Sequence, residues 1–259
     1  MPAVTPSVKS RLSAAGIHLT LSLAVAALAA WLVFGLWYPY PYREISGGSH
    51  LFLIVMAVDV IMGPLLTLAV FNRNKPTAEL RRDLTVIGIL QVAALAYGLW
   101  AVSVARPVHL VFEIDRFRVV HAIDIPEEEM DLAPPELRRL PWTGPTLLSV
   151  RNFRSQQEGS DATLAAVQGF PLGARPFLWQ RYDEARPQIL KVARPLGDLK
   201  NRFPGQVGTI DAALRSGPDR GRTSESVAYV PMAGRDKFWT VLLDLRTTEV
   251  IAFVPIDSF

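Results

Sequence analysis

The chain has 259 residues, half of them hydrophobic, and its charged fraction of 20% lies below the roughly 25% usual for soluble proteins. Residues 1–105 carry seven basic and four acidic side chains, whereas residues 106–259 carry 20 of each. This balance argues against nucleic-acid binding, which needs a basic face to neutralise phosphates. The absence of cysteine excludes a disulfide scaffold, a zinc–thiolate site and a thiol nucleophile.

Three long apolar segments predict transmembrane helices. Ile17–Tyr38 has 22 residues, and Leu51–Phe71 and Leu84–Val104 have 21 each. About 20 residues at 1.5 Å each cross the roughly 30 Å hydrocarbon core of a bilayer. The expected organisation is a cytoplasmic tail (1–16), a three-helix transmembrane region (17–104) and a periplasmic domain (105–259).

An alternative for the first segment is a cleaved signal peptide, because Ala27-Leu28-Ala29 has the small-x-small form of a cleavage site. Cleavage there would leave the apolar remnant Ala30–Tyr38 at the new N-terminus. The apolar run is also longer than the about 7–15 residues of a signal peptide. We therefore favour an uncleaved helix.

Basic residues outside the spans predict the orientation. The tail and the second loop carry six of them, and the first loop carries one. The positive-inside rule places the tail and second loop in the cytoplasm, and three crossings then put the C-terminal domain on the outer face of the inner membrane. The basic residues are Lys9, Arg11, Arg73, Lys75, Arg81 and Arg82 against Arg43. Aromatic belts are expected at the outer boundary, formed by Trp37, Tyr38, Tyr40 and Tyr42 after the first span and by Trp100 near the end of the third.

Asp59 lies within the second span, where a carboxylate costs about 2.5–3.5 kcal/mol near mid-bilayer. It lies eight residues from the outer end of its span, about 12 Å. Tyr97 is about 10 Å from the outer end of the third span and Gln91 about 20 Å. Depth therefore predicts Tyr97 as the partner of Asp59, with Gln91 second. We favour a structural helix–helix hydrogen bond over a binding or relay site.

Small and polar residues predict how the spans pack. Asp59, Gly63 and Thr67 share one helical face, and Pro64 should kink this helix and free a backbone carbonyl. In the third span the face suited to close packing comprises Gly88, Gln91, Leu95 and Gly98. His18 is expected at the cytoplasmic end of the first span.

Strands open and close the expected periplasmic domain, and helices lie between them, which predicts an α+β fold. A hairpin is expected from 108–114 and 117–125, and closing strands at 226–232, 238–244 and 250–256. Helical stretches are expected at 160–168, capped by Ser160, and within 177–192 and 196–215, with mostly loop at 127–145.

No catalytic, cofactor-binding or metal-binding residue is predicted. The sequence contains no phosphate loop, HExxH, GxSxG or dinucleotide fingerprint. His109 and His121 fall on adjacent hairpin strands at positions that should not pair directly. The acidic run at 127–129 is interpreted as a solvated loop, and Arg116 and Arg118 as a solvated strand face rather than a ligand clamp.

A series of short strings, in this order and spacing, resembles the TfpX/TfpZ family of type IV pilin accessory proteins. The likeness covers about residues 10–125, and more weakly the closing strands with Tyr229-Val230-Pro231-Met232. The strings are Trp37-Tyr38-Pro39-Tyr40-Pro41-Tyr42, Gly47-Gly48, Val58-Asp59-Val60, Gly63-Pro64-Leu65-Leu66-Thr67-Leu68, Asp83-Leu84, Gln91, Ala94-Leu95, Tyr97-Gly98, Ala105-Arg106-Pro107, Val111-Phe112 and Asp115-Arg116-Phe117.

The resemblance implies a non-enzymatic inner-membrane protein with an external domain, which assists pilus assembly by contact with pilin or the assembly platform and shifts the balance of assembly and retraction. No cofactor is expected, and the expected partners are pilin, the platform and membrane lipid. The residues that match the family pattern are Asp59, Gly63, Pro64, Gln91, Tyr97, Arg106, Pro107, Asp115, Arg116 and Phe117.

The resemblance assigns no physical role to Arg106 or to residues 126–225. Arg106, just outside the membrane, could bind lipid headgroups or pair with Asp115. Residues 126–225 carry no recognised pattern, and we expect them to read the pilin head, because loops on a fixed scaffold usually carry specificity.

The alternative function is a membrane-anchored periplasmic sensor or ligand-binding module, and an enzyme is a distant third.

Overall fold

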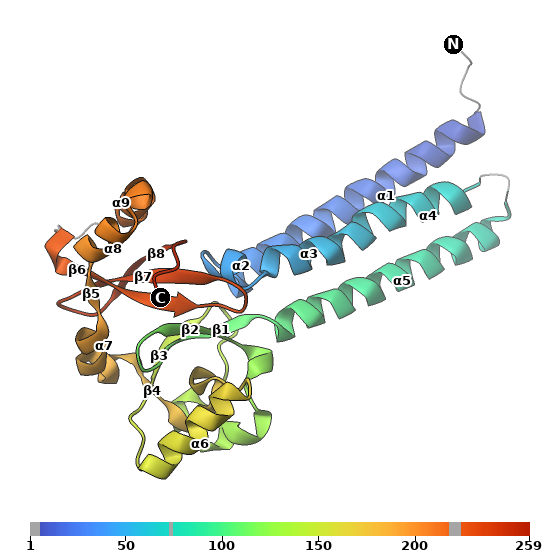
Figure 1. Cartoon of the computed structure of the whole chain (residues 1–259). Helices are drawn as coiled ribbons and strands as arrows, with labels where there is room; N and C mark the ends of the chain where they lie inside the picture. Colours follow the sequence, from blue (N-terminus) through green and yellow to red (C-terminus); the bar gives the residue numbers. More distant parts are fainter. Residues whose placement is uncertain (1–5, 73–74, 218–223) are drawn as a thin grey trace. The chain divides into compact units, whose positions relative to one another are not determined.

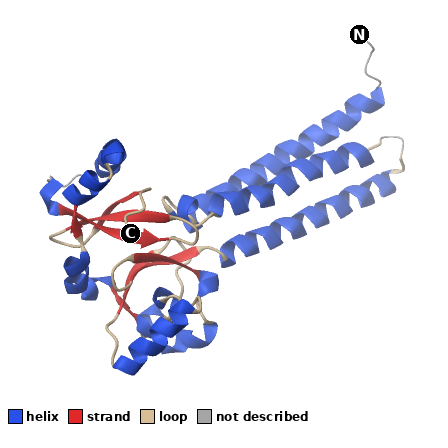
Figure 2. Ribbon diagram, in the orientation of Figure 1, coloured by secondary structure: helices blue, strands red, loops and turns tan. Residues whose placement is uncertain are grey.

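The computed structural model describes residues 6–72, 75–217 and 224–259 (Figure 1). The chain divides into two compact units. One, the helical unit, comprises the chain up to Tyr38 and Gly47–Val104. The other, the sheet domain, comprises Pro39–Ser46 and Ala105–Phe259, and it contains the strands (Figure 2).

The helical unit contains three helices long and apolar enough to cross a membrane, among the residues that the structure describes. They cover Val8–Trp37, Gly48–Val70 and Thr77–Val104, which confirms the three predicted segments. The elements are α1 (Pro6–Ala30) with the π-helical continuation Trp31–Trp37, then α3 (Gly48–Ala57), the π-helical turn Val58–Met62 and α4 (Gly63–Val70), then α5 (Thr77–Val104).

Each helix begins before the predicted span. The first starts at Pro6 rather than at residue 17, and α5 starts at Thr77 rather than at residue 84. Hydropathy marks only the apolar part of a helix, whereas Lys, Arg and Glu are themselves good helix formers and extend it. At the start of α5, Lys75 holds Asp83 with its Nζ 2.9 Å from Oδ2.

The sheet domain is built on one mixed sheet with strand order β4-β3-β1-β2-β6-β7-β8, in which β5 pairs with β6. The predicted hairpin and closing strands are confirmed, whereas β3, β4 and β5 had no counterpart among the predicted strands. The strands are β1 (Pro107–Phe112), β2 (Phe117–His121), β3 (Thr146–Val150), β4 (Trp179–Arg181), β5 (Arg194–Pro195), β6 (Val227–Ala233), β7 (Phe238–Asp244) and β8 (Val250–Val254).

Two groups of strands, one mixed and one antiparallel, meet at a short parallel junction. β1 and β2 form the hairpin, with β3 parallel to β1, while β6, β7 and β8 form an antiparallel meander. The groups join where β2 pairs with β6 through Phe117–Met232 and Arg118–Ala233. Parallel pairing of strands so far apart in sequence leaves no local signal in either strand.

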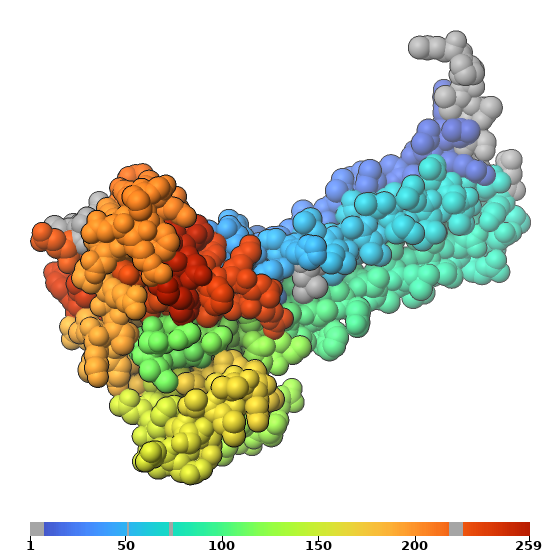
Figure 3. Space-filling model, in the orientation of Figure 1, coloured from blue at the N-terminus to red at the C-terminus, as the bar shows by residue number. Residues whose placement is uncertain are grey.

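Helices and short 3₁₀ turns fill the connections. The helix expected at 160–168 begins earlier, because Ser155 rather than Ser160 caps it: the Ser155 hydroxyl accepts the Glu158 N–H at 3.1 Å. Its atoms lie on the surface, yellow in Figure 3. The helices are α2 (Tyr42–Ile45), α6 (Gln156–Val167), α7 (Arg186–Val192), α8 (Leu196–Arg202) and α9 (Val207–Ser216).

The loop after the first apolar helix belongs to the core of the sheet domain. Tyr42 and Ile45 are 7% and 1% exposed and pack with core residues of β1, β2, β6 and β7. The Tyr42 ring contacts Phe253 edge to face at 6.0 Å. The sheet domain therefore includes residues 39–46 in addition to those after residue 104.

The predicted aromatic belts are consequently wrong for three of their five residues; Trp100, in α5, is 59% exposed. Trp37 and Tyr38 are buried inside the helical unit, where the Tyr38 hydroxyl donates to the Val102 carbonyl at 3.2 Å. Tyr42 is buried in the sheet domain, and Tyr40 is 53% exposed. Aromatic side chains near the end of an apolar segment serve packing as readily as an interface.

Candidate functional site

Within the helical unit, a polar cluster draws on all three apolar helices. Asp59, Gly63 and Thr67 are buried on one face of the second helix, as the spacing predicted. His18 of α1 lies with Nδ1 2.5 Å from the Thr67 hydroxyl. Gln91 of α5 donates its Nε2 to the backbone carbonyl of Asp59 at 3.2 Å. We call these five residues the polar cluster.

The backbone explains why Gln91 reaches this carbonyl. Asp59 lies in the π-helical turn, where a carbonyl bonds the N–H five residues on, and that position is Pro64, which has no N–H. Gly63 leaves the necessary space, because a Cβ there would lie 2.1 Å from Gln91 Nε2. Gly63 and Pro64 together therefore open the Asp59 carbonyl to a donor from α5.

The predicted pairing of Asp59 with Tyr97 is wrong. Tyr97 is 69% exposed and lies against Trp100, with ring centroids 5.6 Å apart. Depth alone predicted the partner, but Tyr97 follows Gln91 by six residues and so points about 240° around the helix from it. The direction in which a side chain points around the helix axis, and not its depth alone, therefore determines which residue contacts Asp59.

The Asp59 carboxyl group is the least satisfied member of the polar cluster. Its Oδ1 is buried and makes no hydrogen bond to the residues that the structure describes. His18 is close enough to interact with it electrostatically. His18 was expected at the cytoplasmic end of the first span, and α1 continues before it to Pro6. Sequence reasoning did not connect His18 with Thr67 or Asp59.

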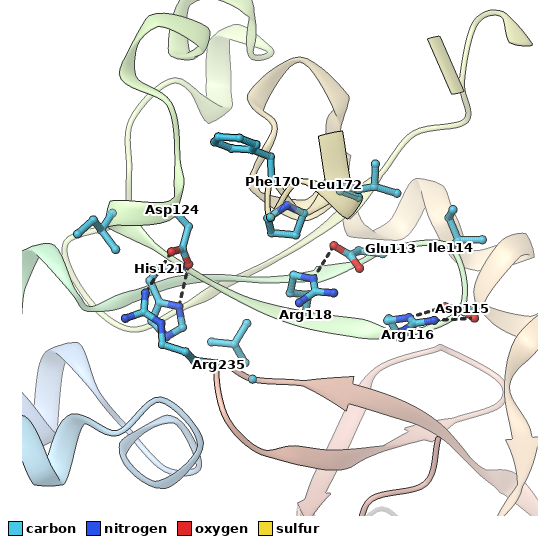
Figure 4. A pocket seen from close by; sticks show the side chains of 16 residues that line it. Glu113, Ile114, Asp115, Arg116, Arg118, His121, Asp124, Phe170, Leu172 and Arg235 are labelled. Atoms are coloured by element: carbon cyan, nitrogen blue, oxygen red, sulfur yellow. Dashed lines mark hydrogen bonds and ion pairs between the residues drawn. The ribbon is translucent and has the colours of Figure 1, made fainter. Parts of the chain in front are cut away.

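A second candidate site lies on the sheet domain, a cleft of about 700 Å³ over the β1–β2 hairpin. Figure 4 shows charged residues in a row along the hairpin, opposite Phe170 and Leu172. Three ion pairs form this row: Arg116 Nε to Asp115 Oδ1 at 2.7 Å, Arg118 Nε to Glu113 Oε1 at 2.9 Å, and Arg235 Nη2 to Asp124 Oδ1 at 3.1 Å.

Two of the carboxylates have further hydrogen-bond partners besides their arginines. Glu113, whose side chain is 7% exposed, also accepts the Gly173 N–H at 2.9 Å. Asp124 lies beside both the N–H and the Nδ1 of His121, at 3.1 and 3.0 Å. Burial acts to raise the pKa of Asp124, but the hydrogen bonds from His121 outweigh it and hold the pKa below its usual range. Asp124 therefore stays ionised beside Arg235.

The structure corrects the interpretation of several charged residues. Arg118 was expected on a solvated strand face, but it pairs with the buried Glu113 and lines the cleft. Glu129, expected in a solvated run, is held by Arg175 with Nη2 2.7 Å from Oε1. Neither pairing can be seen in a local sequence pattern. Glu129 and Arg175 are far apart in sequence, and Glu113 and Arg118 are brought together by the register of the hairpin.

The predicted membrane-proximal residues separate in the structure. Arg106 donates to the Pro141 carbonyl at 3.3 Å and lies over the Trp142 ring. Of its two open interpretations, pairing with Asp115 is wrong, because Asp115 pairs with Arg116 at the far end of the hairpin. Pro107 begins β1. Phe117 is fully buried against Phe112, with ring centroids 5.5 Å apart.

His109 is a core residue. It lies opposite Val120 rather than His121, as the positions predicted. Its Nδ1 is 2.7 Å from the Thr146 hydroxyl, and burial lowers the pKa of His109 to about 3. The imidazole is therefore neutral at physiological pH.

Comparisons with known proteins identify the family. The model of the fimbrial assembly protein FimB matches residues 6–47. The chain is 37% identical over 246 residues to a fimbrial assembly protein of serogroup I from Dichelobacter nodosus, and 35% identical to that of serogroup E1, covering 94% of each chain in both cases. No solved structure matches the chain significantly. The chain belongs to the fimbrial assembly protein family, which bears out its resemblance to the type IV pilus accessory proteins.

Proposed function

We propose that this chain is an inner-membrane accessory protein of type IV pilus biogenesis, which acts by contact with pilin or the assembly platform and tunes pilus assembly against retraction. The observation that carries the proposal is the similarity to fimbrial assembly proteins over 94% of the chain. Cells with and without the chain should therefore differ in the number of surface pili at equal pilin content.

A non-enzymatic mode of action accords with the two candidate sites. In the cleft, the acidic side chains are held by arginines, by a backbone N–H or by His121. The polar cluster joins three helices through Thr67 and Gln91. Such fixed groups suit recognition and packing, because a general acid or base must exchange protons with a substrate within hydrogen-bond reach.

Membrane insertion is supported by the surface of the helices. Leu28 and Val92 are 69% and 68% exposed, as lipid-facing side chains would be. Orientation is supported by residues 39–46, which share a hydrophobic core with the sheet domain after residue 104. Both parts must then lie on one side of the membrane, as three crossings require. With the basic residues of the tail and second loop inside, that side is the periplasm.

Alkaline phosphatase fusions test this orientation. The enzyme fused after Phe259 should be active, because it is active only after export, whereas a fusion within residues 72–76 should be inactive. Immunoblots establish that both fusions accumulate. An active loop fusion with an inactive C-terminal fusion would contradict the orientation, and with it contact between the sheet domain and exported pilin.

A further inference from the structure

The cleft on the β1–β2 hairpin has more hydrogen-bond donors than its own acceptors use. A guanidinium group has five N–H donors. Among the described residues, Arg118 donates one hydrogen bond, to Glu113, and Arg235 donates one, to Asp124. Glu113 also accepts a hydrogen bond from the Gly173 N–H, and Asp124 also accepts one from His121. The unused hydrogen-bonding capacity of the cleft is therefore mainly cationic.

Exposure points in the same direction. In the buried pair, the Arg118 side chain is 28% exposed and Glu113 only 7%. In the pair with Arg235, the arginine is 46% exposed and Asp124 29%. The third pair is reversed, because the Asp115 side chain is 54% exposed and Arg116 36%. A ligand that enters the cleft at Arg118 and Arg235 thus meets guanidinium groups before carboxylates, and the group that these bind best is a carboxylate, by paired charge-assisted hydrogen bonds.

The walls of the cleft are apolar. Ile114, Ile123 and Phe170 are 60%, 59% and 52% exposed and all line it. Phe170 is presented there because α6 is followed by Gly169, whose φ of +98° turns the chain back. Figure 4 shows Phe170 opposite the row of ion pairs. A free inorganic anion would gain nothing from such walls, whereas a peptide would bury apolar side chains against them.

We propose that this cleft binds an extended protein segment in which a carboxylate is flanked by apolar side chains. The row of guanidinium groups along the hairpin suits an extended ligand, and the apolar walls take its neighbouring side chains. We assign the segment to the pilin subunit before assembly, and this assignment rests on the proposed function. Residues 166–172, within the segment expected to read pilin, supply one wall.

The test is site-specific photocrosslinking of the full chain in its native cells. A photoreactive amino acid replaces Phe170 in the cleft or, as the control, Leu132, which is 63% exposed and does not line it. Pilin antibodies then identify the product. The prediction is a pilin crosslink from position 170 and none from position 132.

Charge variants test the recognition of the carboxylate. Arg116→Gln combined with Arg235→Gln removes two exposed guanidinium groups and keeps the buried Arg118–Glu113 pair, so the fold should persist. The matched control is Arg181→Gln, which removes an arginine that is 65% exposed and paired with Asp183. The pilin crosslink from position 170 should fall about tenfold in the double variant and stay unchanged in the control.

The outcomes separate the cleft from the function. A pilin crosslink from position 132 but none from position 170 overturns the cleft and leaves the proposed function standing. A position-170 crosslink to another protein overturns pilin as the occupant. An undiminished crosslink in the accumulated double variant overturns carboxylate recognition. Equal numbers of surface pili with and without the chain overturn the proposed function itself.

Discussion

Ile45→Ala should lower the free energy of unfolding of the sheet domain by about 2–5 kcal/mol, the usual cost of truncating a fully buried isoleucine. Ile45 is 1% exposed although it lies in a short loop between two apolar helices. The fit around it is close, because a Cβ on Gly234 would lie 2.4 Å from Ile45 Cγ1. Pulse proteolysis of the purified full chain at increasing urea concentrations measures the change.

The control lies in the same loop. Tyr40 is 53% exposed and touches Trp239 only edge to face at a centroid distance of 6.2 Å. Tyr40→Ala should therefore cost about 1 kcal/mol or less. If Ile45→Ala destabilises the domain no more than Tyr40→Ala, residues 39–46 are not part of its core, and the argument that places them beside the sheet domain fails.

Gly98→Ala should destabilise the helical unit, by about 1–3 kcal/mol for overpacking at a close contact. A Cβ at position 98 would lie 2.3 Å from Val55 Cγ1 and 2.9 Å from Cγ2. Valine has one strongly preferred χ1 rotamer in a helix and cannot easily turn aside. The helices α3 and α5 must then separate, and the thermal transition of the full chain in detergent should fall.

Gly88 in the same helix provides the matched control. A Cβ there would meet no atom within 4 Å. Gly88→Ala should leave the transition unchanged or raise it, because alanine favours a helix by up to about 1 kcal/mol over glycine. Equal losses from both substitutions would show that the α3–α5 contact at Gly98 does not hold these helices together.

The sequence predicted what is encoded locally. Apolar length revealed the three helices, and alternation revealed the hairpin and the closing strands. It could not reveal the packing of residues 39–46 into the sheet domain, because Tyr42 and Ile45 look like boundary residues until their distant partners are known. The parallel junction of β2 with β6 likewise pairs Phe117 with Met232, and the sequence near either residue does not indicate this pairing.

The candidate sites were predictable to different extents. Asp59 stood out as a charge in an apolar segment, and its shared face with Gly63 and Thr67 followed from helical spacing. Its surroundings did not, because depth along a helix fixes height but not direction. The alternation of Arg116 and Arg118 marked one side of the cleft, whereas Phe170 and Arg235 reach it only through the tertiary fold.

The role of the chain in pilus biogenesis is tested most directly by the number of surface pili per cell, counted by electron microscopy, in cells that lack the chain and in cells that carry it. Total pilin is measured in parallel by immunoblot. We expect that deletion changes the number of pili severalfold while pilin content stays constant, and that the restored chain reverses the change. Equal pilus numbers with and without the chain would contradict its role in pilus biogenesis.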